Sequence, residues 1–340
     1  MLKFIRSLLY GVLSLLLLLT ALSVSAKNFD PPAGGWTPGN YPPTSMTKFD
    51  YLGISGVDGQ QGLTRKYIVH VPKNYDANVA MPLMFCFHGI VQYSQMFCVI
   101  GSTGTGSTTS SNYEERGLVG LSEQKGFILV MVQGLSNSWN GGNCCGVAQI
   151  YGLNDVALVR AILAEVEKHL NVDRTRIYAV GFSNGAFLAN RLACEASDIF
   201  AAIVSGAGGI RLWPMNKCKP ANNVAVLELH GTWDSFVPYV GGKQSADYWA
   251  KVNGCSAQAS ASSFPPSGGD TQCVSYEGCP ADGQVTMCTI QHGGHCWFGS
   301  ASCGTGFGGI GAAVALLGGK NSDTMVDTDA VWPFLSQFHR

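Results

Sequence analysis

The six residues Gly181-Phe182-Ser183-Asn184-Gly185-Ala186 constrain this chain more than any other stretch. They have the form G-x-S-x-G and lie between an apolar run, residues 177–180, and a run with helical spacing, residues 186–194. A strand that turns directly into a helix strains the residue at its apex, and small flanking residues relieve the crowding there. Ser183 would then stand at a helix N-terminus, where unpaired N–H groups and a partial positive charge suit an anion. The pattern predicts a nucleophilic serine, although so short a pattern also arises by chance in a chain rich in Gly and Ser.

Short apolar runs on both sides of this turn predict further strands. Asn154-Asp155 opens an amphipathic helix, because apolar residues recur at helical spacing up to Leu170. Residues 332–335 predict a short C-terminal helix. Strands that alternate with helices predict an α/β fold with a mostly parallel central sheet and helices on both faces. The remaining apolar runs that predict strands are residues 67–71, 82–87, 127–132, 201–205, 224–229 and 285–290.

The N-terminus has the pattern of a secretory signal peptide. Lys3 and Arg6 precede a nearly continuous apolar run, residues 8–22, and the small residues 24–26 end it. A retained membrane anchor is the alternative, because the apolar run is long for a signal peptide. We expect a signal peptide over residues 1–26, an extended arm over 27–50 and a single catalytic domain over 51–340. The net charge of -1 argues against a nucleic-acid partner or an electrostatic membrane attachment.

Twelve cysteines in a chain bound for secretion predict disulfide bonds. We expect the adjacent Cys144 and Cys145 to pair with other residues, and Cys86 in its apolar strand could be a buried free thiol. Six cysteines lie in the last third and predict disulfide-stapled loops. Zinc is the less favoured explanation, because paired C-x2-C motifs with metal spacing are missing from the sequence.

A serine hydroxyl needs a neighbouring base to become a good nucleophile. Asp234 follows the predicted strand 224–229 and is the candidate acid, although an aspartate there can also simply cap a turn. His292 and His295 both follow the strand 285–290 and compete for the role of base. We favour His295, because two glycines precede it and leave it free to point inward. The expected catalytic set is Ser183, Asp234 and His295.

Two backbone N–H groups are needed to hold the negative charge that develops on the substrate oxygen. Asn184, directly after the nucleophile, should supply one of them. The other should come from the loop after residues 82–87, where Ile90 and Gly89 are both candidates. His88 in that loop and His230 are expected to be structural.

These motifs together resemble the secreted family of poly(3-hydroxybutyrate) depolymerases and feruloyl or acetylxylan esterases. The resemblance runs from about Tyr67 to the C-terminus, and it implies the same three catalytic residues. The chain departs from the family at Asn154-Asp155, where Asp-Asp is usual, and at Trp297-Phe298, where Trp-Pro is usual. The residues that carry the resemblance are Phe87-His88-Gly89, Trp139-Asn140-Gly141-Gly142, Cys144-Cys145-Gly146, Asn154-Asp155-Val156, the turn at 181–186, His230-Gly231-Thr232 with Asp234 and Val237-Pro238-Tyr239, and Gly293-Gly294-His295 with Trp297.

The resemblance implies a secreted serine carboxylesterase of α/β-hydrolase fold that needs no cofactor or metal. We expect it to be a monomer without a stable membrane anchor, and to act on feruloyl or acetyl esters of plant cell-wall polysaccharide. Poly(3-hydroxybutyrate) is the alternative substrate, and a serine peptidase or a non-catalytic binding protein is less favoured. Trp139 and Trp297 could line the acyl or sugar site, or could simply pack in the core.

Overall fold

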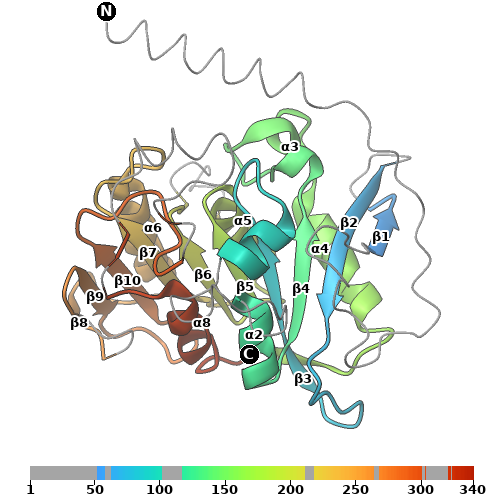
Figure 1. The fold of residues 1–340 in the computed structure, drawn as a ribbon. Helices are drawn as coiled ribbons and strands as arrows, with labels where there is room; N and C mark the ends of the chain where they lie inside the picture. Colours follow the sequence, from blue (N-terminus) through green and yellow to red (C-terminus); the bar gives the residue numbers. More distant parts are fainter. Residues whose placement is uncertain are drawn as a thin grey trace, which may run out of the picture.

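The computed structural model describes residues 52–57, 63–101, 117–210, 218–263, 268–300, 303, 321–322 and 324–340. The signal peptide and the extended arm predicted for residues 1–50 lie outside the described residues. One ten-stranded sheet of order β1-β2-β4-β3-β5-β6-β7-β10-β9-β8 runs through the molecule (Figure 1). The six strands from β4 to β10 in that order are parallel, and both ends of the sheet continue in antiparallel strands. The α/β fold expected from the sequence is confirmed.

Strands and helices alternate through most of the chain, as the apolar runs predicted. The strands are β1 Leu52–Ser55, β2 Thr64–His70, β3 Met81–Phe87, β4 Ile128–Gln133, β5 Val172–Phe182, β6 Ala202–Gly206, β7 Ala225–Gly231, β8 Ala259–Ala261, β9 Thr271–Tyr276 and β10 Val285–Ile290. The helices are α2 Gly117–Lys125, α3 Gly146–Ile150, α4 Asp155–Val166, α5 Asn184–Glu195, α6 Tyr239–Val252 and α8 Asp327–Leu335, with a π-helix η1 Met96–Gly101 and a 3₁₀ turn η3 Leu135–Asn137.

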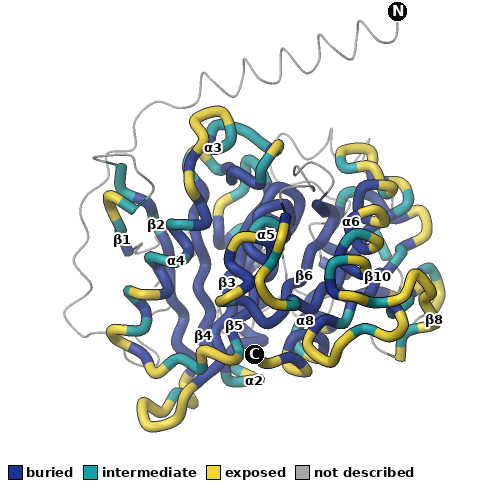
Figure 2. The backbone as a smooth tube through the Cα atoms, turned by 180° about the vertical axis from the view of Figure 1, so that it is seen from behind, coloured by how far each residue is buried: buried dark blue, intermediate teal, exposed yellow. Residues whose placement is uncertain are grey.

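The sheet has a separate apolar core on each face. Strand β3 is buried along its whole length, and Phe85 and Phe87 pack into the core that α4, α5 and α6 cover. Met84 and Cys86, which alternate with them, pack into the core that α2 and α8 cover. Figure 2 shows the central strands as buried and the exposed segments at the rim. Two covered faces leave the strand ends as the place for a site.

Helix α4 begins where the sequence predicted it. The side chain of Asn154 accepts a hydrogen bond from the Ala157 N–H at 3.0 Å and so caps the first turn. Apolar residues of α4 from Val156 to Val166 face the core beside α5. The two helices are therefore held together on one face of the sheet.

Two of the cysteine predictions were wrong. Cys86 is not a free thiol, because η1 packs against β3 and brings Cys98 into a disulfide with it. Cys144 and Cys145 are bonded to each other. The peptide between them is cis and their Cα atoms are 3.0 Å apart, whereas the prediction expected that a bond between adjacent cysteines would be too strained to form.

The expected stapling of the last third is confirmed. Three disulfides there join residues that are close in sequence and surround strands β9 and β10. These pairs are Cys255–Cys279, Cys273–Cys288 and Cys296–Cys303, and a fourth, Cys194–Cys218, lies before them.

Candidate active site

The turn from β5 into α5 has the strained apex that its sequence predicted. Ser183 has φ 54° and ψ −118°, a backbone conformation that residues with a side chain rarely adopt. A Cβ on Gly181 would come within 2.2 Å of the Gly185 carbonyl oxygen, and one on Gly185 within 2.1 Å of the Phe87 oxygen. Only glycine fits at these two positions, so the G-x-S-x-G pattern follows from close backbone packing around the serine.

The structure brings the three predicted catalytic side chains together. His295 Nε2 lies 2.8 Å from Ser183 Oγ, and His295 Nδ1 lies 2.7 Å from Asp234 Oδ2. In the neutral tautomer with the proton on Nδ1, the ring donates to the carboxylate and the serine hydroxyl donates to Nε2. His292 points elsewhere, because its ring packs against Trp233 with centroids 4.5 Å apart. The geometry thus separates the two histidines as the sequence analysis expected.

Asp234 is held as a carboxylate by several donors. Its Oδ1 accepts hydrogen bonds from the backbone N–H groups of Phe236 at 2.9 Å and Val237 at 2.8 Å. Burial opposes its charge and would raise the pKa of Asp234, but hydrogen bonds and attraction from His230 and His295 outweigh burial and hold that pKa well below its usual range. A permanently charged Asp234 can orient the His295 ring and stabilise its protonated form.

His230 lies beneath this carboxylate and is structural, as expected. Its Nε2–H donates to the Val237 carbonyl at 2.8 Å and is 3.3 Å from Asp234 Oδ2. Its side chain is completely buried under α6, where Gly242 leaves room for the ring. His230 therefore fixes the loop that carries Asp234.

Two backbone N–H groups at the site have no acceptor within the described part of the chain. They belong to Asn184, the first residue of α5, and to Ile90. The Gly89 N–H is engaged, since it donates to Gln92 Oε1 at 2.8 Å. A Cβ on Gly89 would lie 3.3 Å from the Ser183 Cβ, so this loop lies directly against the nucleophile. Hydrogen bonding therefore favours Ile90 over Gly89, a choice that the sequence left open.

His88 secures the loop that carries Ile90. Its Nδ1–H donates to the Gly89 carbonyl at 2.7 Å, and its Nε2 accepts from the Gly134 N–H at 3.0 Å. Complete burial lowers the pKa of His88 to about 4, although the hydrogen bond to Gly89 acts in the opposite direction. The neutral ring is thus a fixed connector, and the structural role predicted for it is confirmed.

Trp139 joins the loop that carries Ile90 to the start of helix α5. Its indole Nε1–H donates to the His88 carbonyl at 2.8 Å, and its backbone N–H donates to Asn184 Oδ1 at 2.7 Å. Asn184 Nδ2 returns a hydrogen bond to the Trp139 carbonyl at 3.0 Å. The loop that carries Ile90 and the first residue of α5, Asn184, are therefore tied together through Trp139.

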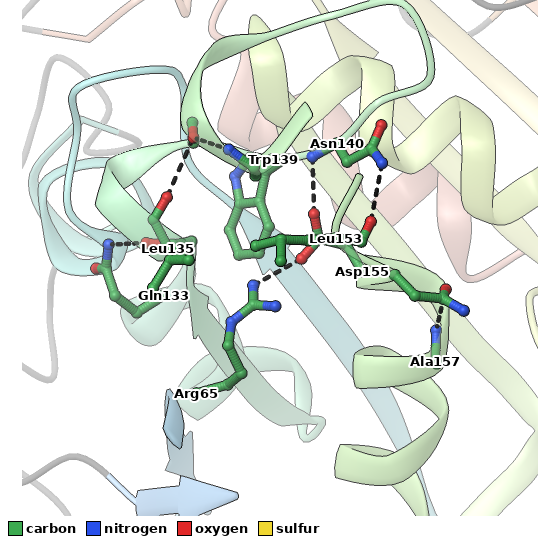
Figure 3. A network of polar contacts seen from close by, with 12 residues as sticks. Arg65, Gln133, Leu135, Trp139, Asn140, Leu153, Asp155 and Ala157 are labelled. Atoms are coloured by element: carbon green, nitrogen blue, oxygen red, sulfur yellow. Dashed lines mark hydrogen bonds and ion pairs between the residues drawn. The ribbon is translucent and has the colours of Figure 1, made fainter. Parts of the chain in front are cut away.

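A buried ion pair anchors the far side of the Trp139 loop (Figure 3). Arg65 Nη2 donates to Asp155 Oδ1 at 2.6 Å, and the Asn140 N–H donates to Asp155 Oδ2 at 2.7 Å. Both charged side chains are fully buried. The sequence analysis missed this pair, because Arg65 and Asp155 are 90 residues apart and no local pattern connects them.

The two tryptophans offered as substrate contacts lie in the core instead. Trp139 has no exposed surface, and Trp297 is 3% exposed. The Trp297 indole donates to Thr328 Oγ1 at 3.0 Å, and its ring fills the space above Gly206. Of the two explanations that the sequence allowed, packing is correct for both, because each indole N–H finds an internal acceptor. Among the described residues, the exposed Phe236 packs on His295 and the exposed Trp233 packs on His292; the sequence analysis selected neither.

Known proteins resemble this chain in sequence and in fold. Residues 154–268 match the family described as phospholipase/carboxylesterase. Feruloyl esterase D from Neurospora crassa is 30% identical over 236 residues, which cover 68% of this chain and 74% of that protein. This chain belongs to the feruloyl esterase family. It is therefore a carboxylic ester hydrolase.

Two further comparisons are with a second feruloyl esterase and with a solved esterase structure. Feruloyl esterase B from Piromyces equi is 29% identical over 252 residues, 68% of this chain, and this chain spans 42% of that protein's length. The structure of an acetyl xylan esterase from Aspergillus awamori matches with a TM-score of 0.51 at 15% identity, over 73% of this chain and 94% of that one. At 15% identity the structural match shows a shared fold and nothing more.

Proposed function

We propose that this esterase hydrolyses feruloyl or acetyl esters of plant cell-wall polysaccharide, with Ser183 as nucleophile, His295 as general base and acid, and Asp234 as its orienting carboxylate. One observation carries the proposal: the unbroken line of hydrogen bonds from Asp234 through His295 to Ser183. The relatives named as feruloyl esterases support the choice of acyl group.

The reaction would proceed in two halves. Ser183 Oγ attacks the ester carbonyl while its proton passes to His295 Nε2. The negative oxygen that forms accepts hydrogen bonds from the backbone N–H groups of Asn184 and Ile90. The tetrahedral intermediate collapses, and the protonated His295 gives its proton to the leaving alcohol. A water molecule, deprotonated by His295, then attacks the acyl-serine, and His295 returns that proton to Ser183 Oγ as the carboxylic acid leaves.

We also propose that the protein is secreted and acts as a monomer. Six disulfides within the described residues support an oxidising compartment. In the described part of the chain, no helix combines the length and apolar character needed to cross a bilayer. The apolar N-terminus that would direct export lies outside that part.

The test compares the wild type with Ser183→Ala on methyl ferulate, acetylated xylan and a poly(3-hydroxybutyrate) film. We expect turnover of the first or second substrate by the wild type, and a loss of about 10⁴-fold or more in the variant with an unchanged circular dichroism spectrum. Retained turnover in Ser183→Ala would reject the mechanism. Turnover of the polyester alone would reject the substrate class.

A further inference from the structure

Two large aromatic side chains on the loop after β7 are turned toward solvent. Trp233 is 60% exposed and Phe236 is 46% exposed, on either side of Asp234. Most other large aromatic side chains of the described residues are buried in one of the two cores. Leaving aromatic surface in water is unfavourable, and its concentration beside a reactive group points to a binding surface.

Both side chains pack against the loop after β10, Trp233 on His292 and Phe236 on His295, and we call them the aromatic shelf (Trp233 and Phe236, supported by His292). The Trp233 N–H donates to the Gly293 carbonyl at 2.9 Å, and the His292 N–H donates to Thr232 Oγ1 at 2.8 Å. The His292 ring packs against the Trp233 ring. These two hydrogen bonds, one between backbone groups and one to the Thr232 hydroxyl, therefore tie the two loops together.

The shelf adjoins the side of the site from which the alcohol leaves. The Phe236 ring lies 5.4 Å from the His295 ring, measured between centroids. His295 Nε2 must hand its proton to the alcohol oxygen, so the alcohol departs alongside this ring. The carbonyl oxygen points instead toward the N–H groups of Asn184 and Ile90. The shelf is thus placed to contact the alcohol half of an ester.

We propose that the aromatic shelf binds a sugar ring of the leaving polysaccharide. A sugar ring has an apolar face of C–H groups that stacks on an aromatic ring, while its hydroxyl groups stay in water at the edge. A half-exposed tryptophan and phenylalanine suit such a ligand, which is apolar on one face and wet on the other. This inference rests on the proposed function, because it assigns the alcohol half of the same ester.

The test uses pairs of esters that share an acyl group and differ in the alcohol. One pair is methyl ferulate and a feruloylated arabinoxylan trisaccharide, and the other is ethyl acetate and acetylated xylotriose. In Trp233→Ala we expect kcat/KM on the sugar esters to fall about tenfold, mainly through KM, and on the simple esters by less than about twofold. Trp233→Phe should keep most of the wild-type value, because it retains a flat ring.

Val79→Ala is the matched control, since Val79 is also 60% exposed but lies in the turn between β2 and β3. An equal fall on sugar and simple esters would overturn the proposal, and so would no fall on either. Binding of unesterified arabinoxylan trisaccharide to Ser183→Ala, measured by calorimetry, tests the shelf without turnover. Unchanged affinity in Ser183→Ala/Trp233→Ala would reject the shelf, whereas absent turnover of every ester by the wild type would reject the proposed function.

Discussion

The two halves of the site are built in different ways. The half that supplies the N–H groups is buried and fully connected, from Arg65 and Asp155 through Trp139 to His88. The half that supplies Asp234 and His295 lies on two loops with exposed aromatic side chains. Donors for a developing charge act best when they cannot reorganise, whereas the side that releases a polymer must stay open. The contrast indicates that the side of Ser183 with the N–H groups is rigid, and that the opposite side is open to the substrate.

The sharpest way to separate the halves is to remove the base. In His295→Ala we expect kcat/KM on methyl ferulate to fall about 10⁴-fold or more, because Ser183 loses its proton acceptor. We expect the urea midpoint to change little, since the buried Asp234 keeps its hydrogen bonds from the Phe236 and Val237 N–H groups and its contact with His230. His169→Ala, a histidine in the turn after α4 that pairs with Glu165, is the control. A large loss of stability in His295→Ala would contradict the division.

The opposite result is expected in the connected half. Arg65→Met leaves the buried carboxylate of Asp155 without its cation, which should lower the free energy of unfolding by about 3–5 kcal/mol. Urea denaturation of the folded enzyme measures this loss. Arg65→Met/Asp155→Leu should recover a large part of it, because neither charge is then buried alone. No difference between the single and the double variant would mean that the pair contributes little to the connected half.

A smaller effect is expected beneath the open half, at Glu228 in β7. Burial raises the pKa of Glu228 to about 7, although hydrogen bonds from Ser245 and others act against this. The folded state therefore holds a proton between about pH 4.5 and 7 that the unfolded state releases, and stability should fall as pH rises through this window.

Glu228→Gln keeps the shape and removes the titration, so it should gain on the order of 2–3 kcal/mol relative to the wild type between pH 5 and 8. Urea midpoints of the two proteins across this range measure the difference. A constant difference at all pH values would show that Glu228 does not titrate there. Asp247→Asn, an exposed carboxylate on α6, serves as the comparison.

The central strands and the nucleophile turn were predictable because their signals are local. Apolar runs marked β3, β4, β6, β7 and β10, and the spacing of two glycines marked Ser183. Three strands towards the two ends of the sheet, β1, β8 and β9, were missed, because their exposed or mixed residues lack a continuous apolar run.

What the sequence could not provide were contacts between distant segments. The Gly89 N–H donates to the Gln92 side chain, whereas the Ile90 N–H does not, and this difference cannot be read from the sequence. The two tryptophans illustrate the same limit, because burial depends on the surrounding fold and not on the residue type. Trp233 is exposed and Trp139 is buried, yet both stand in loops after strands.

The Cys296–Cys303 bond begins at the residue directly after His295, and Cys273–Cys288 ties together the strands that lead into the same loop. Reducing agents should therefore be avoided when the protein is prepared and stored. A thiol reductant in the storage buffer would cut the bond next to His295, the proposed base, while the helices stay folded, so we expect a reduced preparation to keep its helical spectrum and lose activity. Expression hosts and buffers should therefore be chosen for their oxidising power.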